Sequence, residues 1–258
     1  MFDYRNRQDK SLLRLSTGKA FTINGIIRGV SVRKGETIME KIDLLISFFE
    51  ANRNEDNAIP MQKYMKDHFP FLGIKTPERR GLMKQFYQKT GILEEELQTN
   101  FIELLWEKNE REYQYAALDY INRVLKKVNV DHLPLLENLI TSKSWWDTVD
   151  TIAPHPVGKI ARETPRILDD TIEGWSKSGN LWLRRSAILF QLRYKEETDE
   201  TRLYRYILTN ADSKEFFIQK AIGWALREYS KTNPSSVKSF IENHSLAKLS
   251  IREGSKYI

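Results

Sequence analysis

The chain has 258 residues, of which 40% are hydrophobic and 29% charged, and its net charge is +6. This balance is typical of a globular protein with a sizeable core. The absence of cysteine excludes disulfides, thiol nucleophiles and cysteine-ligated metal centres. No apolar run reaches the ~18–20 residues that a membrane span needs. The four histidines lack the spacing of metal ligands. We therefore expect no membrane span, no metal and no cofactor.

Residues 1–38 differ from the rest of the chain. They hold eight basic and three acidic residues, which leaves a net charge of only +1 for residues 39–258. Four glycines interrupt them, and no helical period is visible. They could be a targeting arm, although their acidic residues fit that poorly, or a disordered basic arm that holds DNA phosphates. We favour a third hypothesis, a misassigned start: Lys34-Gly35-Glu36 can be encoded as AAA-GGA-GAG, a bacterial ribosome-binding sequence shortly before Met39.

From Met39 onward the apolar residues follow a helical period. In the first such segment they lie at Ile42, Leu45, Ile46 and Phe49, which is one face of a helix. Strand-like alternation is scarce in the rest of the chain. The sequence therefore predicts an all-α domain over residues 39–258.

Three short motifs predict where helices begin. Thr76-Pro77-Glu78 offers a capping residue followed by proline at the first helical position. Ser144 with Asp147 fits a capping box, and so does Asp212 with Glu215.

A short pattern recurs along the chain: alanine, an aliphatic residue, any residue, then an aromatic residue. It begins at Ala117, Ala187 and Ala221, and Asp150 occupies the corresponding position in the segment between the first two. The spacings are 33, 37 and 34 residues. A period near 35 is typical of stacked helix pairs that form a curved solenoid with a concave face.

The segment SWWDTVD, residues 144–150, has two different helical faces. Trp145 and Val149 share a spacing that points to the core, whereas Trp146 and Asp150 form an i, i+4 pair turned about 100° away. Two interpretations of that pair remain open. Asp150 could cap a neighbouring helix while Trp146 packs, which geometry alone slightly favours, or the pair could belong to a binding site.

Two later segments combine arginine or lysine with aromatic residues. In residues 180–195, Arg184 and Arg185 interrupt a largely apolar helix, so each needs an acidic or phosphate partner. The commoner arrangement is an ion pair with an adjacent repeat. In residues 216–231, Trp224 shares a face with three cations, which suits a sugar–phosphate backbone, although a core tryptophan under a solvated stripe fits equally well. These cations are Lys220, Arg227 and Lys231.

Several long segments closely resemble the AlkD family of bacterial DNA alkylation repair enzymes, in register from about Met39 to near the C-terminus. They are FLGIKTPERR (71–80), EREYQYAALDYI (110–121), TSKSWWDTVDTI (141–152), WLRRSAILFQLRYK (182–195) and SKEFFIQKAIGWALREYSKTNP (213–234). The resemblance implies a superhelical solenoid of HEAT-like helix pairs with a concave DNA-binding face. It also implies removal of alkylated purines from duplex DNA.

The resemblance assigns roles to particular residues. Asp150 matches the catalytic carboxylate, and Trp146 and Trp224 match tryptophans that contact the deoxyribose of the lesion. We assign DNA binding to Arg185, Tyr64, Thr76, Arg80, Arg193 and Arg227. Lys75 stands where close relatives are expected to have glutamine.

The resemblance implies a DNA glycosylase of base excision repair that hydrolyses the N-glycosidic bond of cationic N3- or N7-alkylated purines. A carboxylate stabilises the positive charge that develops on the sugar, and a cationic base leaves without a general acid. The resemblance implies that the base need not be flipped out of the duplex. We expect a cytoplasmic, nucleoid-associated monomer whose partner is double-stranded DNA. The alternatives are a non-catalytic DNA-damage binder and a protein-binding scaffold.

Overall fold

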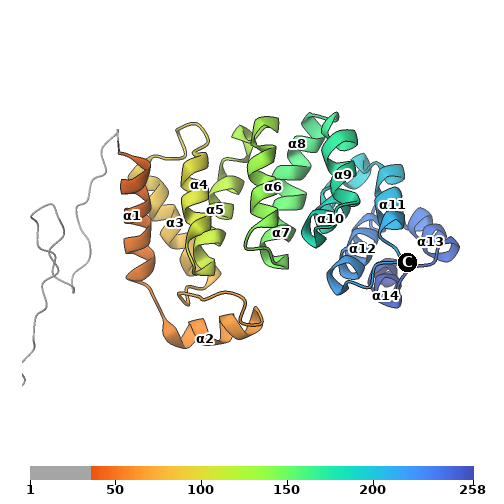
Figure 1. Cartoon of the computed structure of the whole chain (residues 1–258), viewed down its shortest axis with the longest axis horizontal. Helices are drawn as coiled ribbons and strands as arrows, with labels where there is room; N and C mark the ends of the chain where they lie inside the picture. The colour runs from red at the N-terminus through yellow and green to blue at the C-terminus, as the bar shows by residue number, and fades with distance from the viewer. Residues whose placement is uncertain (1–35) are drawn as a thin grey trace, which may run out of the picture. The chain divides into compact units, whose positions relative to one another are not determined.

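The computed structural model describes residues 36–258, and within these residues the secondary structure is helical, without strands. The all-α prediction is therefore confirmed. The helices, in chain order (Figure 1), are α1 (Ile38–Glu50), α2 (Glu55–Tyr64), α3 (Thr76–Thr90), α4 (Thr99–Glu107), α5 (Arg111–Arg123), α6 (Leu133–Thr141), α7 (Trp146–Ile152), α8 (Gly158–Glu163), α9 (Glu173–Ser176), α10 (Leu181–Leu189), α11 (Glu200–Thr209), α12 (Phe216–Tyr229), α13 (Pro234–Asn243) and α14 (Lys248–Gly254).

The hypotheses for the N-terminal segment fall almost entirely on residues 1–35, which lie outside the described part. The described part begins just before α1. Thr37 caps this helix in a full capping box with Glu40, whose carboxylate accepts the backbone N–H of Thr37 at 2.8 Å. Helix α1 thus begins at Ile38, one residue before the expected domain boundary at Met39.

The helices stack in two layers, as expected for a helical solenoid. Helices α3, α5, α7, α10, α12 and α14 contact one another in that order and form one layer. A second layer covers it, with α1 and α4 against α3 and α5, α6 against α7 and α10, and α13 against α12. Figure 1 shows the pairs following one another in chain order from α1 to α14. This repeated stacking positions side chains of the first layer along one continuous surface.

The residues of the recurring sequence pattern lie at the contacts between successive helices. Ala117, Ala187 and Ala221 are at most 1% exposed, because a small side chain lets the neighbouring helices approach closely. Asp150 occupies the matching position of α7. One repeat therefore places a carboxylate where the others place a methyl group.

The expected helix starts are wrong in detail. Thr76 is the first residue of α3 and Lys75 precedes it without a side-chain cap, although proline does occupy the first turn. The hydroxyl of Ser144 donates to the carbonyl of Ile140 at 2.7 Å, and Asp147 binds an arginine instead of capping α7. Glu215 directly precedes α12 and makes no side-chain cap. Charged partners and turn geometry compete with capping for these short polar side chains.

Among the described helices, none is both long enough and apolar enough to cross a lipid bilayer.

Candidate functional site

Asp150 and Arg185 form a buried ion pair between α7 and α10. The two oxygens of Asp150 accept hydrogen bonds from Nε and Nη2 of Arg185, both at 2.7 Å. The remaining amino group of Arg185 donates to the carbonyl of Phe217. The side chains are 14% and 5% exposed, respectively. The sequence left Arg185 with either an acidic or a phosphate partner, and the structure shows an ion pair with an acidic residue of the adjacent repeat. Asp150 does not cap a neighbouring helix within residues 36–258. Contact of Arg185 with DNA stays a prediction.

The surroundings of Asp150 act on its pKa in opposite directions. Burial raises the pKa of Asp150 above its usual range, and the hydrogen bonds and charge of Arg185 oppose this shift. A bidentate guanidinium is the partner that best holds a carboxylate in one orientation. The carboxylate of Asp150 is therefore held in one orientation, and Arg185 is the group that favours its ionised form.

A cavity of about 390 Å³ opens beside this pair, and we call it the aromatic cavity. Two of its walls are Trp146 from α7 and Trp224 from α12. It is lined by Trp146, Asp150, Arg185, Phe216, Phe217, Lys220, Trp224, Arg227 and Glu253. The structure therefore brings together the three residues expected to be catalytic and two of those expected to bind DNA.

Val149, on the other face of α7, is fully buried as predicted, and Ile152 on the same face is fully buried too. Trp145 is half-buried and packs among other rings, with its centroid 4.9 Å from that of Phe217.

A second cavity, of about 610 Å³, lies on the other side of Trp146, and we call it the cationic cavity. Trp146 lines both cavities. Tyr64, which is 69% exposed, meets Trp146 edge-on with their centroids 6.0 Å apart. The positively charged residues that line the cationic cavity are Lys75, Arg79 and Arg80, and Thr76 lies between them in sequence. Tyr64, Thr76 and Arg80 thus share a cavity with Trp146, one of the three catalytic candidates.

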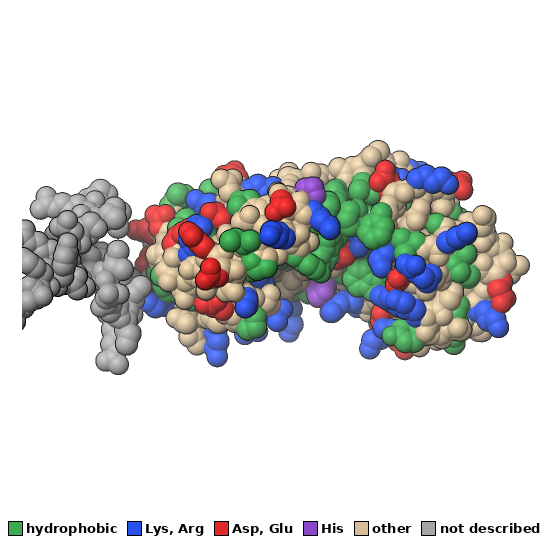
Figure 2. All heavy atoms as spheres, turned by 90° about the horizontal axis from the view of Figure 1, so that it is seen from below, with side chains coloured by type: hydrophobic (Ala, Val, Ile, Leu, Met, Phe, Trp, Pro, Cys, Tyr) green, Lys and Arg blue, Asp and Glu red, His purple; other side chains and the backbone are tan. Residues whose placement is uncertain are grey.

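The cations continue beyond these two cavities. Arg80 also lines a third cavity, of about 550 Å³, together with Lys84 and Arg123. Shared residues therefore connect the three cavities in a row across α3, α5, α7, α10 and α12. On the face seen from below, Figure 2 shows Lys and Arg side chains on both sides of a hydrophobic patch. A row of cavities lined by aromatic rings and cations is suited to binding a polyanion that exposes sugar and base surfaces.

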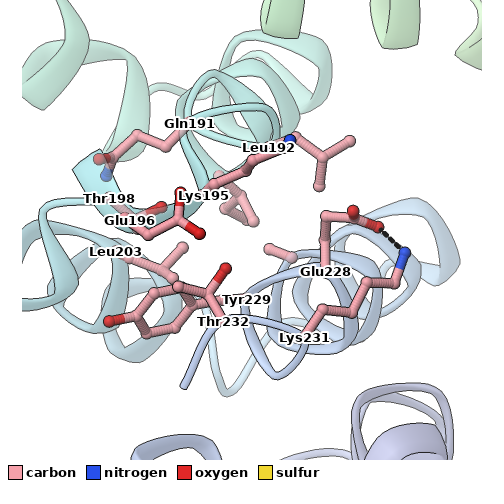
Figure 3. A pocket seen from close by; sticks show the side chains of 12 residues that line it. Gln191, Leu192, Lys195, Glu196, Thr198, Leu203, Glu228, Tyr229, Lys231 and Thr232 are labelled. Carbon is pink, nitrogen blue, oxygen red and sulfur yellow. Dashed lines mark hydrogen bonds and ion pairs between the residues drawn. The ribbon is translucent and has the colours of Figure 1, made fainter. Parts of the chain in front are cut away.

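Two expected cations lie elsewhere. Lys231 does not line the aromatic cavity with Trp224; it pairs with Glu228 at 2.7 Å and lines a separate cavity near the ends of α10 and α12 (Figure 3). Lys231 follows Trp224 by seven residues and lies two residues beyond the end of α12 at Tyr229, past the aromatic cavity. Arg193 is exposed beyond α10, where its charge adds to burial in lowering the pKa of His155. Its DNA contact stays a prediction.

A second arginine–aspartate pair was missed. Arg111, which is fully buried, donates to both oxygens of Asp147 at 2.9 and 2.7 Å, and Tyr115 donates to the same carboxylate at 2.7 Å. The residues of the two pairs are 36 and 35 positions apart, which is the repeat period. That shared spacing is the signal that could have predicted both.

Glu253 is the other missed residue of the site. Its carboxylate lies 3.3 Å from Lys220, 3.0 Å from Arg227 and 2.8 Å from Lys256. The hydrogen bond of Lys256, followed by the hydrogen bond and charge of Lys220, lowers the pKa of Glu253 to about 2. Glu253 is an acid beside cations that were expected to bind DNA, and it lies about 30 residues from them in sequence, so no local pattern predicted it.

No group of three histidines, acidic residues or cysteines within residues 36–258 is arranged to hold a metal ion. The chemistry available at the site is that of carboxylates, guanidinium groups and aromatic rings.

The fold and the site together define a HEAT-like helical repeat protein. Its first layer of helices, which includes α3, α7 and α12, carries an aromatic and cationic surface around a fixed carboxylate. A sequence model of the family described as DNA alkylation repair enzyme matches residues 45–258. The chain belongs to this family.

Solved structures agree with this membership. A predicted DNA alkylation repair enzyme from Enterococcus faecalis has 36% sequence identity over 80% of this chain and 96% of its own, with a TM-score of 0.71. AlkD2 from Streptococcus mutans shares the fold, with 19% identity over 71% of this chain and 90% of its own and a TM-score of 0.52. No protein of curated function matches the chain.

Proposed function

We propose that this member of the DNA alkylation repair family is a DNA glycosylase for cationic purines alkylated at N3 or N7, such as 3-methyladenine and 7-methylguanine, in duplex DNA. The observation that carries the proposal is Asp150, fixed by Arg185 in a cavity between Trp146 and Trp224. Membership of the family supports a role in repair of alkylated DNA.

The reaction breaks the bond between C1′ of the deoxyribose and the purine nitrogen. The bonding electrons leave with the base, which was cationic and departs neutral, and positive charge develops on the sugar. Asp150 stabilises that charge, and the faces of Trp146 and Trp224 add cation–π attraction. Water then adds to C1′ and releases a proton. Because the base departs neutral, no general acid is needed, and neutral damaged bases are poor substrates.

The open row of cavities supports recognition without base flipping. The cationic cavity and the third cavity offer Arg80, Lys84 and Arg123 to the phosphate backbone, while the aromatic cavity takes the sugar of the lesion. The base itself then needs no pocket of its own, in contrast to most enzymes that act on a base in duplex DNA. Bulky cationic adducts should therefore also be removed.

The test is release of free methylpurine from methylated duplex DNA. We expect the wild-type protein to release it, and Asp150→Asn to lose release by a factor of at least about 100 while it still binds DNA. Asp147→Asn is the matched control, because it also breaks a buried arginine–aspartate pair of α7. Asp147 lines the cationic cavity and not the aromatic cavity, so release is compared in single-turnover reactions at saturating protein, where a change in DNA affinity has no effect. The control should retain release at temperatures at which it is folded.

One observation favours a second candidate function. Arg185 occupies both oxygens of Asp150, an arrangement that also suits a purely structural carboxylate in a non-catalytic DNA-damage binder. A folded wild-type protein that binds methylated duplex but releases no base would establish this second function and contradict the first.

A further inference from the structure

The aromatic cavity contains a second carboxylate, Glu253, which the proposed reaction does not use. Glu253 is 8% exposed and lies on α14, which packs against α12. The approach is close: a methyl group added at Gly223 would lie 2.5 Å from Cβ of Glu253. The position of Glu253 over α12 is therefore set by backbone packing and not by a flexible side chain alone.

Glu253 binds the two cations that flank Trp224. Lys220 precedes Trp224 by four residues and Arg227 follows it by three, so all three side chains share one face of α12. The carboxylate contacts Lys220 at 3.3 Å and Arg227 at 3.0 Å. A phosphate that approaches either cation must share it with an anion already in place.

We propose that Glu253 is a specificity-determining residue, which weakens binding of undamaged DNA by holding Lys220 and Arg227 and favours a positively charged lesion by its own negative charge. The proposal rests on the proposed function, because it takes DNA as the ligand of the aromatic cavity. Repulsion of phosphates lowers the affinity for every duplex, whereas attraction of positive charge restores affinity only for a duplex with a cationic lesion. The second effect therefore sets the selectivity, and the first keeps binding of undamaged DNA weak.

Binding to an unmodified duplex tests the first effect. Glu253→Gln removes the negative charge and nearly conserves side-chain size, so this variant should bind the unmodified duplex about threefold to tenfold more tightly at low salt. The matched control is Glu228→Gln on α12, the helix that carries Lys220 and Arg227. Glu228 pairs with Lys231 in a different cavity (Figure 3), so this control makes the same change in net charge away from the site.

A pair of stable probes tests the second effect. One duplex carries a pyrrolidine, which is cationic at neutral pH, in place of one deoxyribose, and the other carries a neutral tetrahydrofuran of the same size. The preference of the protein for the cationic probe should fall about threefold in Glu253→Gln and stay unchanged in Glu228→Gln.

Three outcomes would overturn the proposal: equal changes in the two variants, no tighter binding by Glu253→Gln, or an undiminished preference for the cationic probe. Neither measurement requires base excision, so failure of the glycosylase proposal would be seen separately, as absent methylpurine release. A wild-type protein that binds neither duplex would contradict both proposals.

A second comparison covers the case in which Glu253→Gln does not fold, as judged by thermal unfolding. Because Glu253 partly neutralises Lys220, Lys220→Gln should weaken binding of the unmodified duplex less than Arg80→Gln. Arg80 lines the cationic cavity and has no ion pair within residues 36–258. An equal or greater loss in Lys220→Gln would contradict the proposal.

Discussion

At the scale of single residues, the site depends on how a buried carboxylate keeps its charge. Desolvation raises the pKa of Asp150 and disfavours its charged form, and the guanidinium of Arg185 opposes this shift. The same two hydrogen bonds also fix the direction of the carboxylate toward the aromatic cavity. In the proposed reaction Arg185 would act through Asp150, whereas the backbone contact that the family resemblance implies stays a prediction.

This arrangement predicts an altered pH dependence in Arg185→Gln. Loss of the guanidinium removes the group that lowers the pKa of Asp150, so this pKa rises further. At any given pH fewer molecules are then ionised, and the acidic limb of the single-turnover excision rate should move to higher pH. An Arg193→Gln control, in which the ion pair is intact, should keep the wild-type profile. If Arg185→Gln lowers only DNA affinity, with its acidic limb in place, Arg185 contacts DNA and does not act through Asp150.

At the scale of secondary-structure elements, Glu112 on α5 holds the segment that leads into α3. Its carboxylate is fully buried and accepts the backbone N–H groups of Leu72, Gly73 and Ile74 at 2.9, 2.9 and 3.1 Å. Gly73 has a φ of +87°, and a side chain there would lie 1.9 Å from the carbonyl oxygen of Asn54. The backbone of residues 72–74 is therefore held in one conformation. This fixes the positions of Phe71 and Lys75, which flank the segment and line the cationic cavity.

Replacement of Glu112 by glutamine should destabilise the protein by about 2–4 kcal/mol, because an amide group presents a donor to buried backbone N–H groups. Urea unfolding would measure this loss. Glu110 lies two residues before Glu112 and pairs with Arg53 in a more exposed position, so Glu110→Gln should cost at most about 1 kcal/mol. Similar losses in the two variants would contradict the anchoring role of Glu112.

Glu253, which holds α14 on α12, should make a contribution to the free energy of unfolding that depends on pH. The pKa of Glu253 falls from an ordinary value of 4.5 to about 2 in the folded protein. A lowered pKa stabilises the folded state above the unfolded value, and this contribution is lost as the pH falls from about 4.5 toward 2. The difference in unfolding free energy between wild type and Glu253→Gln should therefore be largest near neutral pH and shrink below pH 4.5. A difference independent of pH would exclude the ionised carboxylate as its source.

At the scale of the whole molecule, cations of several repeats form one surface although residues 39–258 carry a net charge of only +1. Those that line the three connected cavities are Lys75, Arg79, Arg80, Lys84, Arg123, Arg185, Lys220 and Arg227. Some of them are engaged by acidic residues within the protein. Placement of charge, rather than its total, therefore determines whether the surface attracts a polyanion.

Binding of duplex DNA should accordingly weaken as salt rises. The logarithm of the association constant should fall linearly with the logarithm of salt concentration, with a slope of about −2 to −5, because each engaged phosphate releases close to one counterion. Fluorescence anisotropy at several salt concentrations would measure the slope. Arg80→Gln should reduce it by about one, and Arg205→Gln, which removes a cation that pairs with Glu173 away from these cavities, should not. A slope near zero would contradict backbone binding by this surface.

The sequence alone determined the helical class, the repeat of about 35 residues and the common face of Trp146 and Asp150. These follow from a local period of 3.6 residues and from small residues at regular intervals, which need no knowledge of neighbours. Family resemblance added the expected roles, and the structure gathers Trp146, Asp150 and Trp224 around one cavity.

The tertiary structure decided which charges meet. Arg185 with Asp150, Arg111 with Asp147, and Glu253 with Lys220 and Arg227 each join residues 26 to 36 positions apart. The same residues were open to capping or phosphate binding as long as only their local sequence was known. A short polar side chain takes whichever partner helix packing brings within reach, and a buried charge takes the strongest one available. Partner choice is therefore set by the stacking of repeats, which no local sequence pattern specifies.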